Sequence, residues 1–325
     1  MHTLIRMGLA ALASAAVAAG APATAQQNYP SQPIRMVVPF PPGGLTDNLG
    51  RAVSEVLARS LKQSVVVENR PGAGTLVGAA QVAKAPADGY TLLVATSTTL
   101  GVSPVLFKKT TAFKPDSLTG VAMLGNVTLV LVTRPEFPAR SASELVSEVR
   151  AHPGTYTFAS PGNGTAHHLM LEMLRSREKL DIRHIPYQGT PPAMTDVMAG
   201  RVDFMLLDAS AAVPQIQSGA LKALAVTGSR RLAVLPDVPA FTETYPYMDL
   251  QIWQSIAAPA GTPAAITTLL NDRINQALRS DAFRKQLARI GLEANPMDVD
   301  TLNAFVRRDI DRWTELVELS GSQVD

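Results

Sequence analysis

Three short segments rich in glycine and small hydroxyl residues could bind an anion through their backbone amides. The first is PFPPGGLTD at 39–47, the second is TSTT at 96–99, and the third is SPGNGTAHH at 160–168. Each follows an apolar run typical of a strand and precedes a run with helical spacing. The free amides and positive dipole end of a helix's first turn favour a negative group. We therefore expect these segments to bind a small carboxylate.

The candidate ligand-binding residues lie on these segments, with one further position after another strand-like run. They are Phe40, Pro42, Gly43, Gly44, Thr46, Asp47, Thr96, Ser97, Thr98, Gly162, Gly164, Thr165, His168 and Asp208. Asp208 either faces the ligand or only caps the helix that follows it. We expect His168 to line the pocket and His167 to lie on the surface, because adjacent residues point to different helix faces.

Plain turns and helix caps are the alternative interpretation of the same residues. Pro-Pro-Gly-Gly at 41–44 is by itself a sharp turn, Thr46 or Asp47 is a helix N-cap, and Gly162 and Gly164 are turn residues. A helix terminus contributes about 0.3–1 kcal/mol, and a hydrogen bond to a charged acceptor about 1.5–3 kcal/mol. Several such contacts together would give a micromolar site without an arginine.

The sequence predicts no metal, no cofactor and no catalytic residue. The chain has no cysteine, and the adjacent His167 and His168 cannot chelate as an i, i+4 pair does. A Gly-x-Ser-x-Gly nucleophile motif and a Walker loop are both missing. GAGTLVG at 72–78 is close to a dinucleotide fingerprint, but its third glycine comes one place late and Arg70-Pro71 separates it from the strand.

The N-terminus is typical of a secretory leader. Arg6 precedes an apolar run from Met7 to Val17, and Ala23-Thr24-Ala25 has the pattern that signal peptidase cleaves after. The run is shorter than the ~20 residues that span a bilayer; a retained anchor is the alternative. Removing Arg6 with residues 1–25 lowers the net charge from +2 to +1. With no basic stripe in the chain, we expect no nucleic-acid partner.

Strands and helices alternate twice along the chain, which predicts an α/β fold with mostly parallel sheets. The ranges expected as strands are 34–40, 64–68, 91–95, two within 120–134, 155–159, 182–187, 202–207 and 223–227. Ser141-x-x-Glu144 is a capping box that opens a helix. Thr262 and Pro263 read as an N-cap and first helical residue, with helix from there to the end apart from a stop at Gly291.

Two successive sets of alternating strands and helices indicate two lobes. The long apolar runs 127–133 and 250–258 would be the crossover strands between them. We place lobe 1 at 29–128 with 255–325, and lobe 2 at 129–254.

Short motifs along nearly the whole mature chain carry a family resemblance. They are YPSQPIR at 29–35, VPFPPGG at 38–44 with Thr46-Asp47, ENRPGAG at 68–74, PADGYTL at 86–92, PYQG at 186–189, GRVD at 200–203, LPDVP at 235–239 with Phe241, and Trp253 leading to APAGTP at 258–263. In this order and spacing the sequence resembles the substrate-binding receptors of tripartite tricarboxylate transporters, also called the Bug family of periplasmic proteins.

The resemblance implies a two-lobed periplasmic-binding-protein (Venus flytrap) fold with the ligand between the lobes. The loops matching 40–47 and 96–98 would touch the ligand from one lobe, and residues 162–168 and Asp208 from the other. The family loop often carries serine where this chain has Thr165, whose extra methyl group would reshape the pocket. Family ligands are dicarboxylates, tricarboxylates, amino acids and aromatic acids.

The resemblance also implies a periplasmic receptor that delivers its ligand to membrane permease subunits driven by an ion gradient. We expect the receptor to be a monomer. One alternative is a receptor that presents its ligand to a membrane signalling protein. Another is a periplasmic enzyme that acts on a carboxylate.

Overall fold

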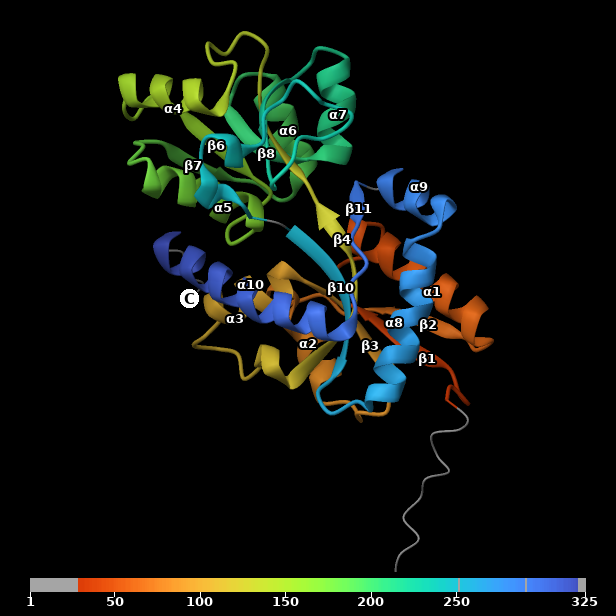
Figure 1. Ribbon diagram of the computed structural model, residues 1–325. Coiled ribbons are helices and arrows are strands. Elements are labelled where there is room, and N and C mark those ends of the chain that lie inside the picture. The colour runs from red at the N-terminus through yellow and green to blue at the C-terminus, as the bar shows by residue number, and fades with distance from the viewer. Residues whose placement is uncertain (1–28, 251, 290, 321–325) are drawn as a thin grey trace, which may run out of the picture.

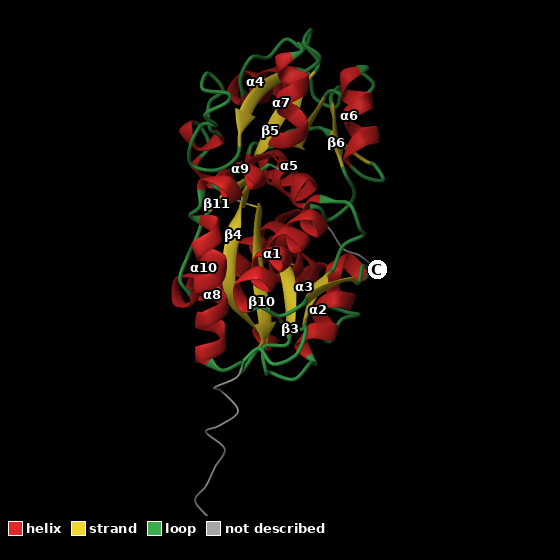
Figure 2. Ribbon diagram, turned by 90° about the vertical axis from the view of Figure 1, so that its right-hand side faces the viewer, coloured by secondary structure: helices red, strands yellow, loops and turns green. Residues whose placement is uncertain are grey.

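The computed structural model describes residues 29–250, 252–289 and 291–320 and shows two lobes, one above the other (Figure 1). The expected leader, residues 1–25 with cleavage after Ala25, lies outside the described residues. Each lobe is built on one sheet, and Figure 2 shows β4 and β10 in the lower lobe and β5 and β6 in the upper. The α/β fold class with two lobes is confirmed.

The sheet of lobe 1 has six strands in the order β11-β4-β10-β3-β1-β2. Their bounds are β1 Ile34–Val38, β2 Val65–Asn69, β3 Thr91–Thr96, β4 Leu118–Val127, β10 Ile252–Pro259 and β11 Leu292–Ala294. β1 pairs parallel with β2 and β3, while β10 runs antiparallel to β3 and β4. The carboxyl ends of the first three strands therefore meet at one edge of the sheet.

Helices cover both faces of this sheet, which explains why its strands are apolar throughout. The helices are α1 Leu45–Leu61, α2 Leu76–Ala83, α3 Ser103–Leu106, α8 Ala264–Leu278, α9 Asp281–Arg289 and α10 Val299–Ser320. Met36 packs in one core with Leu49 and Leu270, and the next residue, Val37, packs in another with Leu76 and Leu302. Alternate residues of β1 thus bury into opposite layers.

The sheet of lobe 2 has five strands in the order β7-β6-β8-β5-β9. The strands are β5 Leu129–Thr133, β6 Thr157–Ser160, β7 Arg183–Pro186, β8 Phe204–Asp208 and β9 Lys222–Val226, and the helices are α4 Ala142–Ala151, α5 Ala166–Arg177, α6 Thr190–Met198 and α7 Ala209–Gln217. Ser141 Oγ accepts a hydrogen bond from Glu144 N at 3.2 Å, as the capping box predicts, but the Glu144 carboxylate binds the amide of Arg140 rather than that of Ser141.

Five short 3-10 or π turns complete the chain. They are η1 Ala73–Thr75, η2 Thr98–Val102, η3 Pro115–Ser117, η4 Phe241–Glu243 and η5 Pro246–Met248.

The chain passes between the sheets at Thr128 and again between β9 and β10. β10 pairs with β4 from Ile252 onward, so the sequence-based boundary at 254 cuts through a strand of the first sheet. We keep the lobe bounds as a proposal with that adjustment. A third link is α10, which lies beside α5, with Arg177 Nη2 3.0 Å from Glu315 Oε1 (Figure 1).

The C-terminal segment differs from the expected run of helices. Gly291, at φ +79°, ends the helical path, and the next residues form the edge strand β11 against β4. A strand of three residues, Leu-Glu-Ala, is too short to show a β pattern. Pro263, not Thr262, is the N-cap of α8, and the Thr262 hydroxyl donates to Pro259 O. Within the described ranges, none of the helices is both long enough and apolar enough to cross a membrane.

Candidate functional site

A cavity of about 1000 Å³ lies between the two lobes, at the carboxyl ends of the parallel strands. This edge is where open α/β sheets bind ligands. Eight expected residues line it: Phe40, Gly44, Thr46, Thr96, Thr98, Gly164, Thr165 and Asp208. Six others do not: Pro42, Gly43, Asp47, Ser97, Gly162 and His168. The three predicted segments therefore converge on one cleft, and contact with a ligand stays a prediction.

The 39–47 loop is held by Asp47, which explains why this residue does not face the cavity. Its buried carboxylate accepts hydrogen bonds from Gly43 N at 2.9 Å, Asn69 Nδ2 at 2.8 Å and Arg51 Nε at 3.0 Å. Burial by itself would raise the pKa of Asp47, but these hydrogen bonds and the Arg51 charge lower it to about 2. Asp47 is therefore ionised at neutral pH and fixes the loop that leads into α1.

The N-terminus of α1 faces the cavity without a side-chain cap. Its N-cap is Gly44, which has no side chain to bind the first amides of the helix. Thr46 Oγ1 lies 3.4 Å from Gln254 Oε1, and both residues are buried and line the cavity. Free amides, a hydroxyl and a carboxamide together make a neutral surface of hydrogen-bond donors that suits a carboxylate.

The segment after β3 contributes Thr96 and Thr98 to the cavity wall. The Thr96 hydroxyl is also used within the segment, since Thr96 Oγ1 is 3.1 Å from Thr99 Oγ1 and accepts from Thr99 N. Ser97 is fully buried, and its hydroxyl has no hydrogen-bond partner in the described residues. Ser97 therefore belongs to the support of this segment rather than to its cleft surface.

The third segment forms a closed turn that leads into α5. The Thr165 hydroxyl accepts from His168 N at 3.3 Å as the N-cap and donates to Gly162 O at 2.8 Å. Thr165 lines the cavity, but its hydroxyl is used inside the turn. Gly164 and Asn163 supply the remaining cleft surface of this segment.

The two histidines lie opposite to our expectation. His167 lines the cavity with its side chain 14% exposed, whereas His168 is buried behind the loop. The physical reason is that α5 begins at Ala166, which turns position 167 toward the cleft and position 168 toward the core of lobe 2. There the His168 ring stacks on His184 with centroids 4.0 Å apart.

His168 supports the cleft loop from behind. Its Nδ1 accepts a hydrogen bond from Gly164 N at 3.2 Å, and its Nε2 lies 3.8 Å from Glu172 Oε1. Burial, followed by the nearby His184 and Arg175, lowers the pKa of His168 to about 3. The ring is therefore neutral, which it must be for Nδ1 to act as an acceptor.

Asp208 stands at the end of β8 beside His167, and its side chain does not cap α7. Asp208 Oδ1 lies 3.4 Å from His167 Nε2, and both residues line the cavity. Burial alone would raise the pKa of Asp208, but the adjacent imidazole lowers it. The carboxyl is therefore ionised, and lobe 2 presents a carboxylate beside an imidazole where lobe 1 presents neutral donors.

Comparison with known proteins assigns the family. Residues 49–321 match the family described as the tripartite tricarboxylate transporter family receptor. The protein BugT of Bordetella pertussis is 38% identical over 315 residues, which cover 96% of each chain. The chain belongs to this receptor family. It is a solute-binding receptor of a periplasmic binding-protein type.

Solved structures of similar receptors agree with the fold. Rpa4515 of R. palustris, solved with adipate, is 30% identical, with a TM-score of 0.78 over 90% of this chain and 98% of that one. MatC from Rhodopseudomonas palustris, solved with bound malate, is 33% identical, with a TM-score of 0.74 over 89% of this chain and 100% of that one. Both neighbours carry a dicarboxylate.

Sequence reasoning missed a fourth junction of the receptor's cleft, the loop before α2. Gly74 and Thr75 line the cavity, and the Thr75 hydroxyl is buried without a partner in the described residues. Thr75 has φ +85° and Ala73 has φ +43°, which are strained values for residues with a Cβ. The signal is present in the sequence, because GAGTLVG at 72–78 is a glycine-rich segment that follows a strand, like the other three.

Other cleft residues of the receptor carry no local signal. Gln254 sits within β10, whose pattern reads as core, and Thr190 begins α6 after Gly189. His167 lines the cavity, whereas the sequence predicts it on the surface. Across the described ranges, no three His, Asp or Glu side chains are grouped so as to hold a metal ion.

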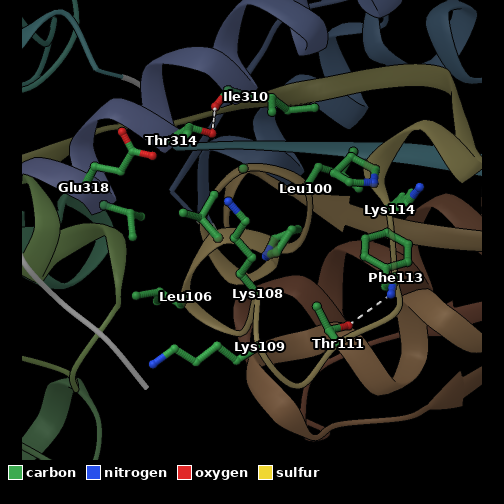
Figure 3. Close-up of a pocket in the computed structure, with 15 residues that line it drawn as sticks. Leu100, Leu106, Lys108, Lys109, Thr111, Phe113, Lys114, Ile310, Thr314 and Glu318 are labelled. Carbon is green, nitrogen blue, oxygen red and sulfur yellow. Dashed lines mark hydrogen bonds between the residues drawn. The ribbon is translucent and has the colours of Figure 1, made fainter. Parts of the chain in front are cut away.

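A second cavity of about 730 Å³ lies in lobe 1 between α3, the loop that follows it and α10 (Figure 3). Leu100, Phe113 and Ile310 give it an apolar wall, and Lys108 and Lys114 line it as well. Leu106 lines both this cavity and the cleft.

Proposed function

We propose that this receptor captures a small carboxylate between its lobes and delivers it, unchanged, to membrane permease subunits of a tripartite tricarboxylate-type transporter. The observation that carries the proposal is the uncapped N-terminus of α1, which faces the same cavity as the Gly164 loop of lobe 2. The adipate and malate complexes of its structural neighbours support a carboxylate ligand. The proposed contacts are the candidate residues that line the cleft, joined by Thr75, Gln254 and His167.

The proposed mechanism is closure of the lobes around the ligand. Because lobe 1 and lobe 2 both line the cavity, a ligand gains its full set of contacts only when the lobes approach each other. Such a ligand shifts the population toward the closed form. The hinge would be the two chain passages, at Thr128 and ahead of Ile252. The closed form is the state that a permease would recognise.

The proposed setting is the periplasm. Residues 1–25 would be removed after Ala25 on export, and the receptor would act as a monomer without metal or cofactor. Proteomic sequencing of the N-terminus from a periplasmic extract tests the export step, and an N-terminus that retains Met1 would contradict it.

Thermal unfolding tests the ligand class. The chain from Gln26 is heated with adipate, malate, citrate, aspartate, glutamate and benzoate at concentrations up to a hundred times the expected Kd. A ligand at that excess stabilises the fold by about 2.7 kcal/mol, or roughly 5 °C or more. A flat panel, with no carboxylate recovered from the denatured protein, would contradict the proposal. A bound carboxylate recovered chemically altered would favour an enzyme instead.

Capture of membrane proteins by the ligand-loaded receptor tests delivery. Retention of permease subunits, dependent on ligand, supports transport. Retention of a signalling protein with no permease would favour the sensory alternative.

A further inference from the structure

Two groups of opposite charge type stand on the lobe 2 wall of the cleft. Of the described residues that line the cavity, His167 and Asp208 are the ones with an imidazole or a carboxyl side chain. The remaining lining residues are apolar, glycine, hydroxyl or carboxamide residues. This pair of residues is therefore where the cleft can discriminate between ligands of different charge.

The pair is isolated from the other ionisable groups around α5. On α5 itself, Glu172 and Arg175 form an ion pair at 2.6 Å, and His168 lies against that pair. From β7, His184 stacks on His168, and from α10, Glu315 pairs with Arg177. From β8, Asp208 is the group that faces His167, at 3.4 Å.

The wall of lobe 1 fixes which end of a ligand meets the pair. A carboxylate bound at the N-terminus of α1 would lie beside Thr46 and Gln254, and the far end of a longer ligand would extend across the cavity toward the lobe 2 residues that line it. A second carboxylate at that far end would meet the ionised Asp208. Like charges in a closed cleft repel strongly. A proton on His167 would offset this repulsion.

We propose that His167 sets the ligand charge that the cleft accepts, so that a dicarboxylate binds together with one proton held by His167 beside Asp208. This inference rests on the proposed function and adds the charge state of the ligand. A histidine side chain gains or loses its proton near neutral pH. Dicarboxylate affinity therefore falls as pH rises, by up to about tenfold per pH unit where one proton is taken up.

Calorimetry on the mature chain measures directly how many protons are taken up when the ligand binds. Adipate is titrated at pH 8 in two buffers with different ionisation enthalpies, and hexanoate, with the same number of carbons but one carboxylate, is the matched probe. We expect uptake of about one proton with adipate and much less with hexanoate. The adipate Kd is then followed from pH 6 to pH 9.

Substitutions assign the proton to its site. His167→Gln keeps a polar side chain but cannot be protonated, so it should abolish the uptake and weaken adipate binding at least tenfold at pH 6. The double variant His167→Gln with Asp208→Asn removes the repelling charge and should restore adipate affinity without pH dependence. His152→Gln, at the C-cap of α4, replaces an exposed imidazole paired with Glu148; it is the control and should leave the uptake unchanged.

The possible failures are distinguishable. Adipate binding without proton uptake, or with the same uptake in His167→Gln, would overturn the inference and leave the proposed function standing. Tight binding of hexanoate without binding of adipate would also overturn the inference and leave the proposed function standing. A receptor that binds no carboxylate of the panel would overturn the proposed function and the inference together.

Discussion

Leu106 of lobe 1 and Gly164 of lobe 2 meet across the cleft so closely that a Cβ on Gly164 would lie 2.5 Å from Leu106 Cδ1. Both residues line the cavity, and Gly164 has φ +73°. Glycine here serves the backbone conformation and also leaves room for the other lobe. The approach of the lobes at this point therefore depends on a missing side chain.

Gly164→Ala should weaken ligand binding by holding the lobes apart. Overpacking costs about 1–3 kcal/mol, which corresponds to roughly 5- to 150-fold in Kd. Calorimetry with the carboxylate identified by thermal unfolding measures the loss, and X-ray scattering should show a larger radius of gyration for the saturated variant than for the wild type.

Gly162→Ala is the matched control for backbone strain. Gly162 also has a positive φ, +149°, but the nearest atom to its added Cβ lies 3.5 Å away. The double variant Leu106→Ala with Gly164→Ala should recover affinity, because the shortened side chain makes room. Equal losses in both glycine variants would mean that strain, not the contact between lobes, limits binding.

Asp47→Asn should destabilise the fold and loosen the 39–47 loop. The substitution replaces an ionised acceptor that serves Gly43, Asn69 and Arg51. The pKa of Asp47 is lowered from 3.8 to about 2, so its contribution of about 2 kcal/mol is present above pH 4 and lost as pH falls through about 2. Urea unfolding should show the largest difference from wild type at pH 7 and a smaller one at pH 3.

An exposed carboxylate gives the comparison for Asp47. Asp272→Asn on α8 removes a surface charge and should leave the unfolding free energy within about 0.5 kcal/mol of wild type. If Asp47→Asn unfolds like Asp272→Asn, the hydrogen bonds to Asp47 do not hold the loop.

Much of the scaffold could be predicted because its signals are local. The apolar runs that become β1, β3 and β8 and the buried face of α1 at Leu49, Ala52, Val53 and Leu57 are visible in short windows of sequence. Their junctions carry glycine and hydroxyl residues, and parallel strands bring those junctions together. The position of the cleft follows from these two facts.

The predictions that differ from the structure concern side-chain directions and backbone conformations that the local sequence does not determine. The start of α5 determines whether His167 or His168 faces the cleft, and a shift of one residue rotates a helix by about 100°. Gln254 reaches the cavity only because β10 pairs with β3 and β4. The positive φ of Thr75 is imposed by its surroundings against its own preference.

Asp309→Ala should be strongly destabilising, and Asp309→Asn should not. Asp309 Oδ2 accepts hydrogen bonds from the indoles of Trp253 in β10 and Trp313 in α10, the latter at 2.8 Å. Alanine leaves two buried N–H groups without an acceptor, a loss of about 2–4 kcal/mol. Chemical unfolding followed by tryptophan fluorescence measures it, with the exposed Asp311→Ala as control.

Asparagine at this position keeps an oxygen acceptor without a charge. Burial raises the pKa of Asp309 more than its two indole hydrogen bonds lower it. A raised pKa means that the folded state disfavours the ionised carboxyl, so this group lowers stability as pH rises above its ordinary range. Asp309→Asn should therefore match or exceed wild-type stability at pH 7. A loss equal to that of alanine would show that the charge itself is required.

Acid should destabilise the receptor from about pH 6.5 downward through the stacked pair His168 and His184. Burial lowers the pKa of His168 to about 3 and that of His184 to about 4, from the usual 6.5. Between these values and 6.5 the unfolded chain binds more protons, so the stability that the neutral rings provide is complete above pH 6.5 and falls below it. The slope is up to about 1.4 kcal/mol per pH unit for each ring.

His184→Gln removes one of the two titrations and retains a partner for Ser160 Oγ, which lies 2.7 Å from His184 Nε2. Urea unfolding at pH 7.5, 6.5 and 5.5 should give a shallower decline for this variant than for wild type, whereas the exposed His152→Gln should follow wild type. Parallel profiles for all three proteins would mean that the stacked rings do not control acid stability. A shallower profile for His184→Gln alone would place the loss of stability directly behind the Gly164 loop, where His168 holds the cleft.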